Sequence, residues 1–170
     1  MRKYQFSWDL IGDIEKGRPN LGNYVSLDTY RLMQCTLRDV IEEKFSADEA
    51  DEIFYKAGKL AGKEFYENFV HPVETLEEFV SKAQHLLKEK GVGVLRMEET
   101  NLQEGKVILT VDEDSDCSGL PVIDYETCIY DEGFFAALFE CYTQKTWKAK
   151  EIDCWCTGAR TCRFAITHDK

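Results

Sequence analysis

The hydrophobic pattern of this 170-residue chain changes character near Gly91, and that change limits the folds open to it. Before this point, apolar residues recur every three to four positions, which predicts amphipathic helices. After it, short β-branched runs between turn residues predict strands. The predicted elements, in chain order, are helices over about 27–45, 47–70 and 76–90, strands over about 92–97 and 107–111, a helix over about 125–142, and strands over about 146–152 and 162–167.

This order of elements predicts an α+β fold, in which N-terminal helices pack on a small, mostly antiparallel, four-stranded sheet. Hydrophobic residues make up 44% of the chain, so a domain of this length can bury a stable core without needing disulfide bonds or a bound metal. We expect residues 1–25 to form an N-terminal arm and residues 26–170 to form a single domain.

Composition and charge argue against several classes of protein. The chain has 32 acidic and 21 basic residues, a net charge of −11 and no basic patch, which argues against nucleic-acid binding. No run of about 18 apolar residues is present, so no membrane span is predicted. The first residues lack the apolar core of a secretion signal, and we therefore expect a cytoplasmic protein whose thiols stay reduced.

Gly58 and Gly62 lie four positions apart inside the helix predicted at 47–70. Each glycine costs a helix about 1 kcal/mol relative to alanine, so another group should approach the backbone closely there. Packing against a second helix is the favoured explanation, and a ligand that passes close to the backbone is the alternative.

Seven cysteines are the most informative chemical feature, because six of them follow residue 116. An odd number without a secretion signal argues against a disulfide framework. Cys154 and Cys162 flank the last predicted hairpin, and the helix before it can bring Cys128 close to them. Three converging thiols indicate a borderline-soft metal, most simply zinc, and buried apolar thiols are the alternative. Candidates for a fourth donor are Glu151, Asp153, Cys156 and a water molecule.

The remaining motifs name no catalytic residue. The acidic run 112–116 lacks the glycine and the terminal glutamate of a calcium-binding loop, and we expect it to be a solvated loop. His71, His85 and His168 are far from the cysteines in sequence, which leaves a cysteine–histidine dyad without support. No glycine-rich phosphate-binding motif is present. Enzymatic activity stays open, and a role without catalysis is favoured.

The C-terminal half carries a set of motifs that resembles a known family. The motifs are Asp116-Cys117-Ser118-Gly119-Leu120-Pro121, Cys128-Ile129-Tyr130-Asp131-Glu132-Gly133-Phe134, Glu151-Ile152-Asp153-Cys154, Gly158 and Cys162-Arg163-Phe164. Together they resemble the 4-vinyl reductase domain family, also described as predicted hydrocarbon-binding proteins. The resemblance covers about residues 90–167.

The resemblance implies a fold similar to subunits of the vesicle-tethering TRAPP complex, commonly dimeric, with an apolar ligand cavity between helices and sheet. The family includes sensor domains of aromatic-responsive transcription activators, in which three cysteines and one glutamate hold zinc. When the family's zinc ligands are transferred to the matching positions of this sequence, the resemblance implies Cys128, Glu151, Cys154 and Cys162. Glu151 and Cys154 are three positions apart and would point to opposite faces of an ideal strand, so a bulge or an early turn is needed if both bind one metal. Such a zinc site would be structural.

The leading hypothesis is a small-molecule-binding sensor or regulatory domain with a buried pocket for a hydrophobic or aromatic ligand. It would act alone, as a homodimer, or through a signalling partner protein. One alternative is a reductase of tetrapyrrole vinyl groups, or a pigment carrier for one, and another is a protein-interaction module. The pocket candidates are apolar and aromatic residues near the cysteines, namely Phe65, Tyr66, Phe69, Phe134, Phe135, Leu138 and Trp155.

Overall fold

The computed structural model describes residues 3–168, which fall into two compact units. The first unit, up to Asp39, contains a 3-10 turn at Trp8–Ile11, the short helix α1 (Ile14–Gly17) and most of helix α2 (Leu27–Lys44). The second unit, from Val40, contains the sheet and the remaining helices. The predicted division into an arm and one domain stays a prediction.

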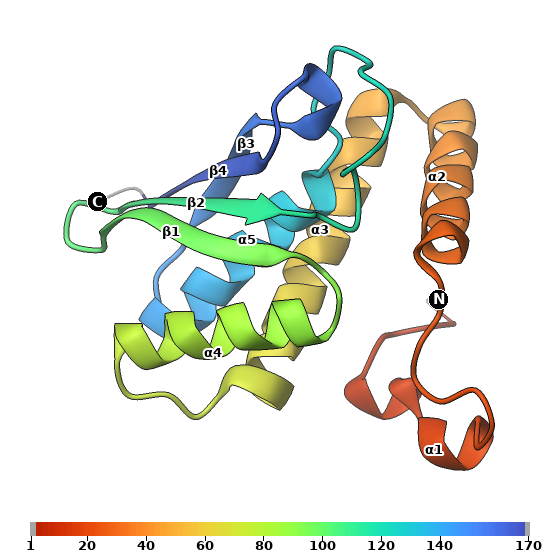
Figure 1. The fold of residues 1–170 in the computed structure, drawn as a ribbon, viewed down its shortest axis with the longest axis horizontal. Coiled ribbons are helices and arrows are strands. Elements are labelled where there is room, and N and C mark those ends of the chain that lie inside the picture. The colour runs from red at the N-terminus through yellow and green to blue at the C-terminus, as the bar shows by residue number, and fades with distance from the viewer. Residues whose placement is uncertain (1–2, 169–170) are drawn as a thin grey trace. The chain divides into compact units, whose positions relative to one another are not determined.

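The second unit is built on a four-stranded antiparallel sheet (Figure 1). Its strands are β1 (Val94–Asn101), β2 (Lys106–Asp112), β3 (Lys148–Asp153) and β4 (Cys162–Thr167). They are ordered β1-β2-β4-β3, so the two hairpins meet where β2 pairs with β4. The predicted α+β class and all four predicted strands are confirmed.

Helices α3 (Ala47–Phe65), α4 (Leu76–Glu89) and α5 (Ile129–Thr143) complete this unit. Helix α5 packs against β3 and β4, α4 packs against β1, and α3 packs on α5. The predicted starts of α3 and α4 are confirmed, because the Ser46 and Thr75 hydroxyls accept hydrogen bonds from backbone amides three residues later. A π-helical turn, Tyr66–Val70, extends α3.

The predicted close approach at Gly58 and Gly62 is confirmed, and its partner is α5. A Cβ atom on Gly58 would collide with the backbone oxygen of Tyr130, and one on Gly62 would collide with that of Phe134. The contact is reciprocal, because a Cβ on Gly133 would collide with a backbone oxygen of α3. The two helices therefore touch backbone to backbone, and helix packing explains the glycines without a ligand.

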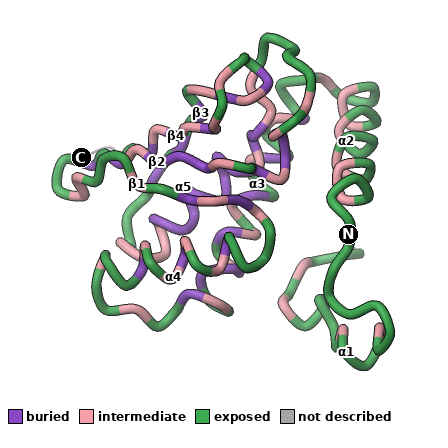
Figure 2. The backbone as a smooth tube through the Cα atoms, viewed as in Figure 1, coloured by how far each residue is buried: buried purple, intermediate pink, exposed green. Residues whose placement is uncertain are grey.

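Burial follows the strand and helix periods that the sequence predicts (Figure 2). Along β4, Cys162, Phe164 and Ile166 are fully buried, while the residues between them are partly exposed. Helix α5 is buried at almost every position from Ile129 to Phe139, as its continuous apolar sequence predicts. The core therefore lies between α5 and the inner face of the sheet.

The acidic run after β2 differs from the prediction. Its residues form a loop, yet Asp114 and Asp116 are only 2% and 5% exposed. The Asp116 backbone amide donates to Asp114 Oδ1 at 2.7 Å, so the loop turns its carboxylates inward. The expectation of a solvated loop is wrong, because the local turn, and not the polarity of the residues, decides where these side chains point.

Within the described residues, no helix combines the length and the apolar character needed to cross a membrane.

Candidate functional site

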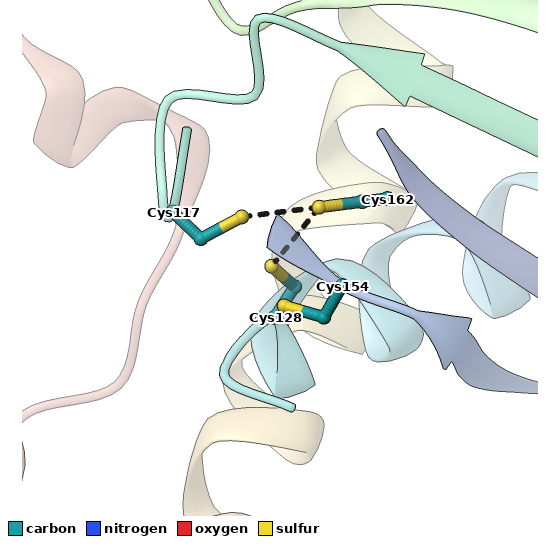
Figure 3. A group of neighbouring side chains, drawn as sticks. All are labelled: Cys117, Cys128, Cys154 and Cys162. Atoms are coloured by element: carbon teal, nitrogen blue, oxygen red, sulfur yellow. Dashed lines mark hydrogen bonds between the residues drawn. The ribbon is translucent and has the colours of Figure 1, made fainter. Parts of the chain in front are cut away.

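Four buried cysteines converge at one end of the sheet (Figure 3). The Sγ atoms of Cys117, Cys128, Cys154 and Cys162 all lie within 4.8 Å of one another. The Cys162 sulfur is 3.0 Å from that of Cys117 and 3.8 Å from that of Cys128. None of the four is exposed to solvent, and all are free thiols.

Three different segments supply these sulfurs. Cys117 lies in the loop that joins β2 to α5, and Cys128 is the residue before the first turn of α5. Cys154 follows β3 and Cys162 opens β4, so the last hairpin contributes two of the four. Gly158, at φ 94°, supplies the left-handed turn that brings these two together. The predicted convergence of Cys128, Cys154 and Cys162 is present.

Glu151, the fourth ligand implied by the family resemblance, is also buried beside this group. Its Oε2 accepts a hydrogen bond from the Cys128 backbone amide at 3.2 Å, at the start of α5. Its Oε1 has no hydrogen-bond partner among the described residues, and it does not join the group of mutually close donors. The register of β3 with β4 shifts between Glu151 and Asp153, and β3 ends before Cys154, which fits the predicted bulge or early turn.

The two other side-chain candidates for the fourth donor, Cys156 and Asp153, are not in the group of mutually close donors, although Cys156 interacts with Cys154. Cys156 is buried and its sulfur accepts a hydrogen bond from the Thr127 hydroxyl at 3.4 Å. Asp153 pairs with Arg163. The sequence interpretation did not assign Cys117 to the site. Its signal was available, because Cys117-Ser118-Gly119 forms a turn motif in the segment that carries the family resemblance.

The thiols and carboxylates perturb one another strongly. Hydrogen bonds from Cys117, Cys128 and Cys162 hold the pKa of the Cys154 thiol far below its ordinary value. Burial, followed by the negative charge of Cys154, raises the pKa of Glu151 to about 8. Without a metal, the cluster therefore favours a thiolate at Cys154 surrounded by neutral donors.

Two buried carboxyl groups border the cluster. Burial, followed by the charge of Asp116, raises the pKa of Asp114 to about 7. Burial also raises the pKa of Asp131, with the charge of Asp114 as the next cause. One oxygen from each of Asp114 and Asp131 lies within 4.8 Å of the Cys128 sulfur and of the other.

The donor set fits a single tetrahedral metal ion. A zinc ion with Zn–S bonds of about 2.3 Å separates its sulfur ligands by about 3.8 Å. The distance between the Cys128 and Cys162 sulfurs equals this value, the distance between the Cys117 and Cys162 sulfurs is shorter at 3.0 Å, and all four sulfurs fall within 4.8 Å of one another. Four buried thiols at this spacing could hold a soft metal ion.

The residues predicted to line a ligand pocket separate into two places. The ring centroid of Phe65 lies 5.2 Å from that of Phe69 and 5.2 Å from that of Phe134. The ring centroids of Phe134 and Phe135 lie 5.5 Å apart. They form one continuous aromatic cluster between α3 and α5. Trp155 instead follows the hairpin strand β3 and donates its indole N–H to the Leu120 carbonyl at 3.0 Å.

Two surface pockets of about 450 Å³ each lie on the second unit. Tyr66 is the one predicted pocket residue that lines either of them. The first pocket combines aromatic side chains with polar ones at the end of α5 and is lined by Tyr66, Val73, Glu74, Leu102, Gln103, Tyr142, Thr143, Lys145 and Trp147. The second lies over the strand pair β3–β4 beside Tyr55.

Comparison with known families matches residues 107–168 to the model of the 4-vinyl reductase domain. The predicted resemblance to this family is confirmed. The matched segment begins in β2 and includes all four cysteines of the cluster. An uncharacterised protein of Methanocaldococcus jannaschii is 24% identical over 147 residues, which cover 86% of this chain and 80% of the relative.

Solved structures share the fold at low sequence identity. The phenol-responsive sensory domain of the transcription activator PoxR, with phenol, superposes with a TM-score of 0.64 at 14% identity, covering 84% of this chain and 74% of that one. A vinyl-4-reductase family protein from Methanocaldococcus jannaschii superposes with a TM-score of 0.62 at 14% sequence identity, and the match covers 88% of this chain and 85% of that one. A trafficking protein particle complex subunit 3 from Naegleria fowleri, covalently bound to palmitic acid, superposes with a TM-score of 0.65 at 9% sequence identity. This match covers 85% of this chain and 95% of that one.

Proposed function

We propose that this chain is a sensor or regulatory domain that binds a small hydrophobic or aromatic molecule. The observation that carries the proposal is the fold shared with a sensory domain in complex with phenol over 84% of this chain, together with the family match. A palmitate-bound protein with the same fold supports an apolar ligand class. Binding would act as a signal through different affinities for two conformations of the domain.

The proposed ligand site lies among the apolar and aromatic residues between α3, with the turn that extends it, and α5. Phe65, Phe134 and Phe135 are buried in one aromatic cluster, and Leu138 lies one turn further along α5. Tyr66 links this cluster to the pocket at the end of α5, because it is buried in the core and lines that pocket too. A pocket of about 300–1,000 Å³ is the usual size for a small ligand. The proposed site comprises Phe65, Tyr66, Phe69, Phe134, Phe135 and Leu138, and the predicted Trp155 lies apart from it on the last hairpin.

The second part of the proposal is a structural zinc ion held by Cys128, Cys154 and Cys162 with a fourth donor. The donor chemistry supports this assignment, since reduced, buried thiols at tetrahedral spacing select zinc among common metals in a cytoplasmic setting. The ion would join the last hairpin to the start of α5, beside the aromatic cluster. The proposed role is to fix the frame of the ligand site, with no open position for catalysis.

We also propose that the chain functions as a homodimer. Helix α2 has no buried residue, and its apolar side chains Leu32, Met33 and Leu37 are each more than half exposed. An apolar helix face of this kind is stabilised by a second copy of itself. Light scattering of the wild-type chain and of Leu37→Glu tests this point. We expect a dimer that the variant converts to a monomer, and a wild-type monomer at high concentration contradicts it.

Ligand binding is tested by titrating the purified, reduced protein with phenol and, separately, with palmitate. We expect at least one probe to raise the melting temperature in a saturable manner. We expect Phe134→Ala to weaken that binding at least tenfold, whereas Tyr125→Ala, at an exposed loop position, leaves it unchanged. Native mass spectrometry of protein from cells would show a co-purified apolar guest. No shift with either probe and no guest would contradict a sensor for apolar ligands.

A further inference from the structure

The metal site has more candidate donors than a tetrahedral ion can use. Besides Cys128, Cys154 and Cys162, both the Cys117 thiol and the Glu151 carboxylate lie beside it. The family resemblance assigns the fourth position to Glu151, whose Oε1 accepts no hydrogen bond from the described residues. The geometry of this chain allows the two candidates to be compared directly.

The distances favour Cys117. Its sulfur lies within 4.8 Å of all three other sulfurs, and its 3.0 Å separation from the Cys162 sulfur would lengthen to about 3.8 Å around a zinc ion. The Glu151 carboxyl interacts with Cys128, Cys154 and Cys162, but it does not belong to the set of mutually close donor atoms found among the described residues. Figure 3 shows the Cys117 and Cys162 side chains extending toward each other from opposite segments, with Cys128 and Cys154 below them.

The hydrogen bonding of Glu151 gives it a different task. Its Oε2 accepts the backbone N–H of Cys128, a donor that the first turn of α5 leaves without a partner inside the helix. The Glu151 backbone amide in turn donates to Glu132 Oε1 at 2.9 Å. These two contacts join β3 to the start of α5, so Glu151 positions Cys128.

The loop that carries Cys117 is held in place by contacts that do not involve its sulfur. The Leu120 amide donates to the Cys117 carbonyl at 2.9 Å and closes a turn. The amides of Ile123 and Asp124 both donate to the Cys156 carbonyl, and Trp155 donates to the Leu120 carbonyl. The loop is thus bound to the hairpin at and beyond the turn, which delivers the Cys117 thiol to the cluster as a preorganised donor.

We propose that Cys117 is the fourth ligand, so that the ion is bound by four thiolates and Glu151 remains outside its coordination sphere. This inference rests on the proposed metal site and changes which segments of the chain the ion joins. The ion then ties three segments together, because the loop between β2 and α5 joins the hairpin and the helix. Loss of metal would release this loop, whose Val122 and Tyr125 side chains face solvent, and would thereby alter one surface of the domain.

X-ray absorption spectroscopy of the zinc-loaded, full-length protein tests the assignment without any substitution. Four sulfurs at about 2.3 Å and no light scatterer are expected, because zinc–oxygen bonds are clearly shorter, at about 2.0–2.2 Å. Cys117→Ser should then show three sulfurs and one light atom, with zinc affinity reduced at least tenfold. Glu151→Gln should keep four sulfurs. Cys156→Ser, which replaces a buried thiol outside the group, is the matched control and should equal the wild type.

Hydrogen exchange gives a second readout that a general loss of stability would not reproduce. In Cys117→Ser loaded with zinc, faster exchange should be confined to residues 113–127, while α5 and the hairpin stay protected. A wild-type spectrum of three sulfurs and one oxygen that loses its oxygen in Glu151→Gln would overturn the role of Cys117 and leave the metal site standing. A reduced wild-type protein that binds no zinc at all would instead overturn the proposed metal site itself.

Discussion

The crossing of α3 and α5 and the cysteine cluster are both buried, yet they are held together in opposite ways. The crossing depends on the absence of side chains, since Gly58, Gly62 and Gly133 let the two backbones touch. The cluster depends on reactive side chains from three segments, packed with carboxyl groups that burial makes costly to ionise. Both regions involve α5, the cluster at its first residues and the crossing along its first half.

The difference separates two sources of stability within one helix. The crossing is complete as it stands, because dispersion and backbone contact need no further component. The cluster holds polar groups that are costly to bury alone, and under the proposed metal site a bound cation would stabilise them. The crossing therefore explains how the domain folds, and the cluster is the place where its state can be changed.

The largest effect is expected at the cluster. Cys154→Ser should abolish zinc binding and lower the free energy of unfolding by several kcal/mol, since binding of a structural metal is folding free energy. Elemental analysis and thermal unfolding measure both changes. Cys35→Ser, at an exposed thiol, should leave both unchanged. If Cys154→Ser and Cys162→Ser both kept full metal content, the cysteines would not be the metal ligands, and the cluster would not differ from the helix crossing in its source of stability.

An intermediate effect is expected at the crossing. Gly133→Ala should destabilise the protein by about 1–3 kcal/mol through backbone collision, in spite of the better helix propensity of alanine. Zinc stoichiometry should not change, because the ligands lie on other residues. Gly17→Ala is the matched control, since nothing lies within 4 Å of that position and it should be neutral or slightly stabilising. A stabilised Gly133→Ala variant, measured by denaturant unfolding, would mean that the helices do not touch.

A smaller effect, which depends on pH, is expected at the carboxyl groups beside the cluster. With its pKa raised from 3.8 to about 7, Asp114 favours the folded state below pH 3.8, and this contribution is lost as the pH rises through 7. Asp114→Asn lacks this loss and should gain stability relative to the wild type between pH 4.5 and 7.5. The gain should grow as the pH rises from 4.5 to 7, because the wild type progressively loses the contribution of the protonated Asp114 over this range.

Denaturant unfolding of the reduced, metal-free protein at several pH values measures this gain. Asp124→Asn, at an exposed position of the same loop, should show the pH dependence of the wild type. Parallel curves for Asp114→Asn and the wild type would contradict the raised pKa of Asp114.

Much of the fold could be predicted because it depends on local patterns. The capping residues Ser46 and Thr75, the apolar run of α5 and the alternation along β4 each determine a neighbouring element. The glycine pair in α3 predicted a close contact but not its partner, because Gly133 follows no spacing rule that links it to Gly58.

The site could be predicted only in part. Hairpin geometry brings Cys154 near Cys162, and a three-residue offset from Glu151 required the bulge that is present. Cys117 lies in a loop whose path depends on hydrogen bonds to residues some thirty to forty positions later, which no periodicity encodes. The buried Asp114 escaped prediction for the same reason.

The most direct test of the metal-framed domain is the zinc content of purified, reduced, full-length protein, measured by native mass spectrometry beside elemental analysis. We expect one zinc ion per chain, retained at neutral pH and removed by a strong chelator with a large fall in melting temperature. A folded protein that carries no metal, takes up none when zinc is added, and melts at the same temperature with and without chelator would contradict this.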